Sequence, residues 1–260
     1  MAVYGAKSPV FAPFAEPENG TEPIKYGAGQ AVGKLVSCGV TPNAAEGSLY
    51  ADNVLAEYVR EPTDTSITLE TDDMTIDRAA MLFGATIVGN DLVYRQTDNS
   101  PLGGYAFYHT AMRDGFKYHI GHFFPKVRAS RNAKTFTTKG SSITFGTASV
   151  AMKAMFTNAG DIEFESEPFT NEADAYGWCA AKLGIGNYHR IDVSATGETA
   201  EKYVDRVGAS FVPAGNGYEL LIVGTPKAAY DNGQDVSASI SGGKYTLSAV
   251  EADHEIVIIF

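Results

Sequence analysis

Residues 105–124 read Tyr-Ala-Phe-Tyr-His-Thr-Ala-Met-Arg-Asp-Gly-Phe-Lys-Tyr-His-Ile-Gly-His-Phe-Phe, and this stretch decides the fold class. From Phe116 onward the side chains alternate with a period of two, which is typical of a β-strand. The preceding run, Tyr105–Met112, is also rich in aromatic residues. Arg113-Asp114-Gly115 supplies a turn, because Asp-Gly tolerates positive φ. The stretch therefore predicts a β-hairpin.

Similar turn signals indicate that β-strands dominate the rest of the chain. Two more hairpins are predicted, Thr86–Val88 with Leu92–Tyr94 across Gly89-Asn90-Asp91, and Met152–Phe156 with Ile162–Glu165 across Asn158-Ala159-Gly160. A further strand is predicted at Ser142–Phe145.

Two segments carry helical signals. Thr75 can cap a helix over Ile76–Phe83 that stops at Gly84. The second predicted helix runs from Thr170 or Asn171 to Leu183, with acidic residues in its first turn, where they oppose the helix dipole. The expected apolar stripes are Ile76, Ala79, Ala80 and Phe83 on the first helix, and Ala173, Tyr176, Ala180 and Leu183 on the second.

The pattern of predicted secondary structure changes after Asn187. Residues 191–260 read as short strands separated by Gly- and Asn-containing turns, which is typical of a small β-sandwich. A chain of 260 residues can bury one sizeable core or two modest ones. We therefore expect a mainly β protein with two domains, 1–186 and 187–260.

Charge and composition narrow the classes of function. The formal net charge is −11 and the pI is about 4.9, which argues against tight DNA binding because that needs many Lys and Arg side chains. No basic segment followed by an apolar run opens the chain, and no apolar run is long enough for a membrane span. Cys38 and Cys179 are expected to be reduced, packed thiols of a protein made in the cytoplasm.

No catalytic, cofactor or metal site emerges from the motifs. Gly27–Leu35 nearly matches a phosphate-binding loop, but Leu35 replaces the hydroxyl and no helix follows, which favours a glycine-rich loop entering a strand. His119 and His122 should point to opposite faces of a strand, and His122 should share its face with His109, with no nearby acid as a third ligand. Asp72-Asp73 is interpreted as the start of a helix.

Two segments of opposite charge favour self-association. Residues 46–77 contain nine acidic residues and one basic one, and residues 113–139 contain seven basic residues and one acidic one. Complementary patches on different faces favour head-to-tail contacts between copies, although two solvated faces of a monomer would carry the same pattern. The interface candidates are Asp52, Glu57, Glu61 and Asp64, and Lys117, Lys126, Arg128 and Arg131.

Several segments, taken in order and spacing over residues 1–186, resemble the major tail tube protein family of siphophages, which are long-tailed, non-contractile bacteriophages. They are Val3-Tyr4-Gly5-Ala6-Lys7, the stretch from Leu49-Tyr50-Ala51-Asp52-Asn53 to Leu55-Ala56-Glu57, Asp72–Gly84, Tyr118–Val127 and Phe169–Gly184. The part from Ile191 onward resembles the immunoglobulin-like modules that some members of this family carry on the tube exterior.

The resemblance implies a tail-tube β-sandwich or barrel with a flanking α-helix, plus a small C-terminal immunoglobulin-like β-sandwich. It further implies a virion protein whose hexameric rings stack into a tube for DNA ejection. A long loop, here Thr41–Asp64, would contact the neighbouring ring. The implied partners are other copies of the chain and the tape measure, tail terminator and distal tail proteins, while DNA passes without specific binding.

Two alternatives of other classes stay open. The C-terminal part could be a surface- or carbohydrate-binding module on a β-sandwich platform, with aromatic contacts from Tyr188, Tyr203, Tyr218, Tyr230 and Tyr245. A nucleotide hydrolase built on Lys34 is the remaining enzyme hypothesis, and we expect no enzymatic activity.

Overall fold

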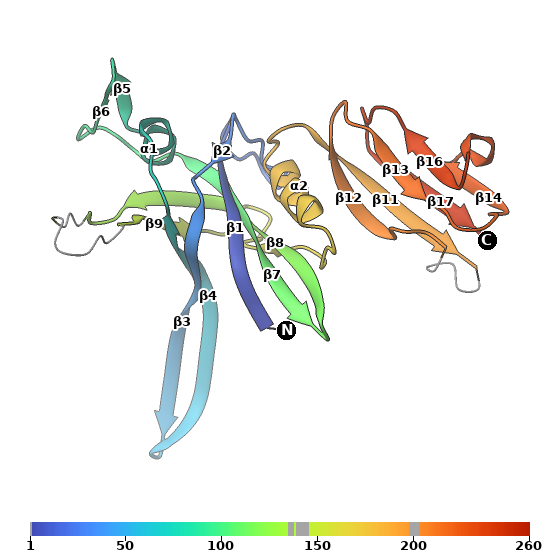
Figure 1. The fold of residues 1–260 in the computed structure, drawn as a ribbon. Helices are drawn as coiled ribbons and strands as arrows, with labels where there is room; N and C mark the ends of the chain where they lie inside the picture. The colour runs from blue at the N-terminus through green and yellow to red at the C-terminus, as the bar shows by residue number, and fades with distance from the viewer. Residues whose placement is uncertain (1, 135–137, 139–145, 198–202) are drawn as a thin grey trace.

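The computed structural model describes residues 2–134, 138, 146–197 and 203–260. It shows a mainly β protein with several antiparallel sheets and a flanking helix, which confirms the predicted fold class. Figure 1 shows helix α2 lying between a large sheet and a smaller set of strands formed by the C-terminal part of the chain. The predicted strand Ser142–Phe145 lies outside the described residues.

The large sheet has eight strands in the order β2-β1-β7-β8-β9-β4-β3, with β10 also paired to β8. A separate hairpin of β5 and β6 follows helix α1. The strand bounds are β1 Ala2–Pro13, β2 Gln30–Ala31, β3 Leu35–Ala51, β4 Val54–Thr71, β5 Thr86–Val88, β6 Asp91–Val93, β7 Leu102–Arg113, β8 Phe116–Arg131, β9 Ala148–Ala154 and β10 Phe164–Glu165.

The hairpin predicted from residues 105–124 is present as β7 and β8. The two strands pair from Leu102 opposite Arg128 to Arg113 opposite Phe116, and both turn residues have positive φ, 53° at Asp114 and 83° at Gly115. Alternate side chains enter two cores. Tyr105 and Phe107 belong to the core that also contains residues of α1, whereas Ala106 and Tyr108 belong to the core under α2.

Helix α1 spans Ile76–Phe83 between the predicted caps. The Thr75 side chain accepts a hydrogen bond from the Arg78 N–H, and Gly84 is left-handed with φ 69°. Its buried residues are Ala79, Leu82 and Phe83, while Ile76 is 41% exposed. The predicted apolar stripe was therefore wrong at Ile76 and missed Leu82, because burial is concentrated in the C-terminal half of the helix.

Helix α2 spans Glu172–Lys182, and Asn171 caps it by accepting a hydrogen bond from the Ala173 N–H. The predicted stripe was right at Ala180 and Leu183, which are buried, but wrong at Ala173, which is exposed. It also missed the buried residues Asp174, Ala175, Gly177 and Cys179. The physical reason is that α2 is covered on two sides. The Cys179 thiol donates to the Phe107 carbonyl of β7, and the backbone of Gly177 lies against Phe211 of β12.

The C-terminal strands form two layers around their own core. One layer is a five-stranded sheet in the order β12-β11-β17-β14-β15, in which β11 and β17 run parallel, and the other is the pair β13 and β16. Ile191, Leu220, Tyr245 and Ile256 are among the residues buried in that core. The bounds are β11 Tyr188–Thr196, β12 Gly208–Pro213, β13 Tyr218–Leu221, β14 Ala228–Asp231, β15 Gln234–Asp235, the 3-10 helix η2 Ser237–Ser239, β16 Lys244–Leu247 and β17 His254–Ile259.

Two further comparisons with the sequence concern long-range pairing. A turn is present at Asn158-Ala159-Gly160, but the predicted hairpin is wrong because β10 pairs with β8 instead of β9. Because α2 packs on both sets of strands, the division into domains 1–186 and 187–260 stays a prediction. In the described part of the chain, no helix has the length and apolar character needed to cross a membrane.

Candidate interaction surfaces

The most prominent surface feature is a long hairpin arm, formed by the distal parts of β3 and β4. The sequence prediction of a loop over Thr41–Asp64 was wrong, because β3 and β4 pair from Leu35 opposite Thr71 to Ala51 opposite Val54. Asp52 and Asn53 close the arm as a two-residue turn with φ of 51° and 61°. Figure 1 shows the arm projecting well away from the rest of the large sheet.

Both edges of the arm are open in the described chain. β3 is the last strand of the sheet, and β4 pairs with β9 only from Thr65 to Thr71. Beyond that point the arm is a two-stranded ribbon, and such a ribbon is at best marginally stable alone in water. Its unpaired N–H and C=O groups are a template for another strand.

Apolar side chains cover both faces of the arm. Leu49 and Tyr50 are neighbours on β3, so their side chains point to opposite faces. Leu55 lies opposite Tyr50 and shares its face, which leaves apolar groups on both faces. Six of them are between 48% and 67% exposed, namely Leu49, Tyr50, Val54, Leu55, Tyr58 and Val59. Exposed apolar side chains gathered in this way are typical of surfaces that contact another macromolecule.

The acidic interface candidates all lie on the arm. Asp52 is at the turn of the arm. Glu57 and Glu61 lie four positions apart on β4 and therefore share one face. Asp64 lies at the base, where it accepts from Asn43 at 2.7 Å and pairs with Lys153 at 3.2 Å. The bonds from Asn43 and then Lys153 lower the pKa of Asp64. The Asp64 carboxylate is therefore already paired within its own chain.

The basic interface candidates all lie on β8. Lys126 forms a 2.7 Å ion pair with Glu18, and the Arg131 guanidinium lies 3.5 Å from the centre of the Tyr94 ring. Lys117 and Arg128 are exposed and form no ion pair with any described residue. Lys117 and Arg128 are thus the members of this group best placed to meet another chain.

Sequence reasoning missed a second exposed apolar patch. It lies where the start of β1 runs beside the β7–β8 turn, with Ala2 opposite Met112 and Arg113 opposite Phe116. The patch covers both faces of the hairpin end, with Val3 and Phe116 on one face and Tyr4 and Met112 on the other, and Phe116 is 68% exposed. The strong alternation of β8 hid this patch, since the pattern does not show where the strand leaves the body of the protein.

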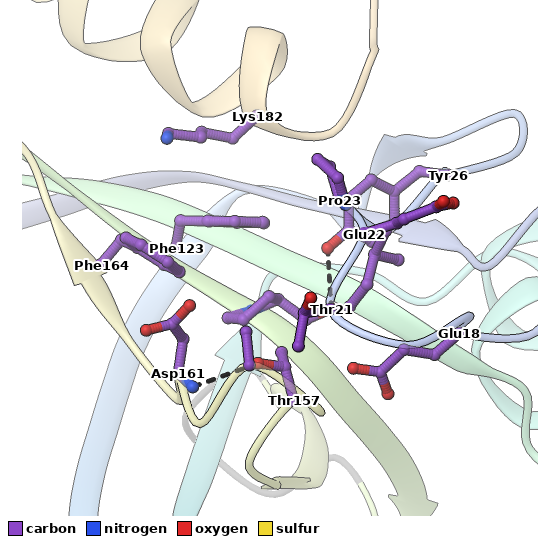
Figure 2. Close-up of a pocket in the computed structure, with 13 residues that line it drawn as sticks. Glu18, Thr21, Glu22, Pro23, Tyr26, Phe123, Thr157, Asp161, Phe164 and Lys182 are labelled. Atoms are coloured by element: carbon purple, nitrogen blue, oxygen red, sulfur yellow. Dashed lines mark hydrogen bonds between the residues drawn. The ribbon is translucent and has the colours of Figure 1, made fainter.

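A pocket of about 320 Å³ lies on the side of the sheet that carries α2 (Figure 2). Phe123 and Phe164 supply aromatic walls with ring centroids 5.8 Å apart, and Tyr26 meets Phe123 edge to face. Figure 2 shows Lys182 on the helix across the pocket from Asp161, with Glu22 and Glu18 on the side of the 14–29 loop. No sequence pattern predicts this pocket, because its walls come from four segments that lie far apart in the chain.

His109 and His122 lie on one face of the sheet, as predicted, and their rings stack. His122 Nε2 lies 2.9 Å from His109 Nδ1, and the His122 ring stacks on Phe107. The expectation that no acid is near was wrong, since Glu163 lies 3.0 Å from His122 Nδ1. Burial and then the neighbouring His122 lower the pKa of His109. No group of three or more potential ligands suited to a metal ion occurs among the described residues.

The remaining motif candidates have structural contacts. The glycine-rich stretch leads through β2 into β3 with no helix, and the Lys34 N–H donates to Asp72 at 2.8 Å. Asp73 lies 3.8 Å from Arg78 in helix α1. Tyr218 and Tyr245 are buried in the C-terminal core, so neither can serve as an exposed aromatic contact. Cys38 and Cys179 are free thiols.

No model of a known protein family matches this chain, and no curated protein matches it either.

Proposed function

We propose that this protein is a structural subunit that assembles with copies of itself into stacked rings, forming the tail tube of a long-tailed bacteriophage. It would be made in the host cytoplasm and reside in the virion tail. The observation that carries the proposal is the hairpin arm, whose two edges and two apolar faces are all exposed in the single chain. A polypeptide that keeps such an arm in water needs a partner surface to cover it.

The sheet topology favours a copy of the same chain as that partner. The sheet ends at β3 on one side, and on the other side β2 covers only Val10 and Phe11 of β1. Two different open edges on one molecule permit head-to-tail contacts, which close into a ring or grow into a filament. Strand pairing between copies would satisfy the exposed backbone groups, and burial of the apolar side chains would add most of the stabilisation.

The acidic character of the chain suits a conduit for DNA. With a net charge of −11, the subunit can present a wall that repels phosphates instead of binding them. In a complete tail, the tube would contact a tape measure protein inside and terminator and distal tail proteins at its two ends. These partners follow from the proposed role as a tail tube subunit.

The test compares the native protein with an arm variant that carries Leu49→Ser, Leu55→Ser, Tyr58→Ser and Val59→Ser. Sedimentation velocity and negative-stain microscopy at rising concentration should show oligomers, rings or tubes for the native protein and monomers for the variant. Because these side chains are exposed, the variant should keep the native thermal midpoint. Equal assembly of both proteins, or a native protein that stays monomeric at every concentration, would contradict the proposal.

A further inference from the structure

The pocket beside α2 combines an aromatic interior with a charged rim. Tyr26, Phe123 and Phe164 line it, and the Tyr26 hydroxyl is fixed by donating to the Pro125 carbonyl at 2.8 Å. Lys182 lies 5.3 Å from the centre of the Phe164 ring, a cation–π distance that holds its ammonium over the aromatic wall. The interior is therefore shaped for a flat apolar group.

The rim of the pocket carries two acidic groups that form no ion pair with the described residues, Glu22 and Asp161. Glu18 is already engaged by Lys126. Lys182 supplies one positive charge on the opposite side, as Figure 2 shows. A fitting occupant would thus bring one apolar group, two positive charges and one negative charge.

The turn between β7 and β8 offers this combination on the same chain. Phe116 is 68% exposed and is flanked by Arg113, Asp114 and Lys117. Arg113 lies opposite Phe116 and shares its face, Asp114 lies in the turn, and Lys117 points to the other face of the hairpin, so two positive charges and one negative charge lie around the tip that carries the aromatic ring. The signs match those of Glu22, Asp161 and Lys182 when each is paired with its opposite.

The turn cannot fill the pocket of its own molecule. Phe116 and Phe123 lie seven positions apart on strand β8, which places them about 23 Å apart at ~3.3 Å per residue. Between these two residues β8 pairs with β7 at every position, so it cannot fold back. A second copy must supply the turn.

We propose that Phe116 of one copy inserts into the aromatic pocket of the next copy, with Arg113 and Lys117 facing Glu22 and Asp161, and Asp114 facing Lys182. This contact rests on the proposed self-assembly and names one of its interfaces. The turn that carries Phe116 (the knob) and the pocket lined by Tyr26, Phe123 and Phe164 (the socket) are different surfaces of one subunit. Each copy can therefore engage two neighbours, and the contact can propagate. A buried aromatic anchor with a charged rim is also the usual anatomy of an interface hot spot.

The direct test is disulfide capture between two single variants. Phe116→Cys mixed with Ala159→Cys, whose position lines the pocket, should give a cross-linked dimer under mild oxidation. The matched control pairs Phe116→Cys with Thr86→Cys, an exposed position on strand β5, and should give none. Equal yields in the two mixtures would overturn the inference, because random collision would then explain the product.

A second measurement uses association strength. Phe116→Ala should weaken self-association at least about tenfold, as expected when an interface anchor is truncated. The double variant Arg113→Glu, Lys117→Glu should lose self-association. Mixing it with the double variant Glu22→Lys, Asp161→Lys should restore association between the two proteins. If the native protein oligomerises while these variants behave as native and no specific cross-link forms, the knob-and-socket contact is refuted and the proposed function stands. If the native protein never oligomerises, both fall.

Discussion

The backbone N–H of Phe211 donates a 2.9 Å hydrogen bond to the carboxylate of Asp174, and both groups are buried. The bond joins β12 of the C-terminal strands to helix α2. Phe169, which precedes that helix in the sequence, also packs edge to face on Phe211, with ring centroids 5.9 Å apart. The C-terminal sandwich is therefore fixed to the large sheet through α2, not merely connected by the residues between them.

Replacing Asp174 should separate the loss of an acceptor from the loss of a charge. Asp174→Ala leaves the Phe211 N–H without its partner and should cost about 1–3 kcal/mol of unfolding free energy. Asp174→Asn keeps an oxygen acceptor and should cost much less. Urea unfolding of both variants at neutral pH measures the difference, and equal losses would show that the hydrogen bond is not the main contribution.

The same carboxyl should give a pH dependence of known sign. Burial raises the pKa of Asp174 above its ordinary 3.8, although the Phe211 N–H and then Arg206 act in the lowering direction. An acid with a raised pKa in the folded state binds more protons there, so its contribution to stability falls as pH rises from 3.8 through the folded pKa. Asp174→Asn should lack this decline, which unfolding measured across that pH range would show.

Gly177 of α2 should resist substitution by alanine. Alanine normally stabilises a helix interior by about 1 kcal/mol relative to glycine. Here an added Cβ would overlap the Cβ of Phe211 and crowd the Tyr188 ring, so we expect destabilisation instead. Thermal unfolding of Gly177→Ala gives the sign, with Ala173→Gly at an exposed position of the same helix as the propensity control. A higher midpoint for Gly177→Ala would contradict the close packing.

The acidic residues of the arm should divide into two groups. Asp52→Lys, Glu57→Lys and Glu61→Lys together should block assembly without altering the thermal midpoint, because these side chains are exposed. Asp64→Ala should instead lower the midpoint, since Asp64 is bonded to Asn43 and Lys153.

The matched control for the triple arm variant reverses the charge at Asp91, Glu251 and Glu255, which are exposed and lie off the arm. Tubes of normal length from the arm variant, seen by electron microscopy, would refute a role for these charges.

The Glu18–Lys126 pair should contribute stability that is lost in acid. Burial acts to raise the pKa of Glu18, but the Asn158 N–H and Lys126 outweigh it, so the net shift is below 4.5. Such a carboxylate stabilises the fold above about pH 4.5 and loses that effect as pH falls through the lowered folded pKa. Glu18→Gln should remove this acid-side slope, whereas Glu16→Gln, at an exposed ion pair with Lys25, should leave it unchanged.

Local signals predicted the elements whose structure is decided locally. The hairpin at Asp114-Gly115 and the helix between Thr75 and Gly84 depend on turn and cap chemistry, which the sequence displays directly. The arm was harder because both of its faces are exposed, so no alternation of apolar and polar residues marks it as strand. The pocket and the β8–β10 pairing depend on segments far apart in sequence, and no local pattern reports them.

The parallel pairing of β11 and β17 has a mechanical consequence. Ile191 lies opposite His254 and Thr196 lies opposite Ile259, so the two strands run side by side in the same direction. A pull applied at Tyr188 and at Phe260 drags them in opposite directions along their length. The load is then shared as shear by all the bonds between them, which must rupture together instead of unzipping in turn. This small sandwich should therefore withstand tension far better than its size suggests.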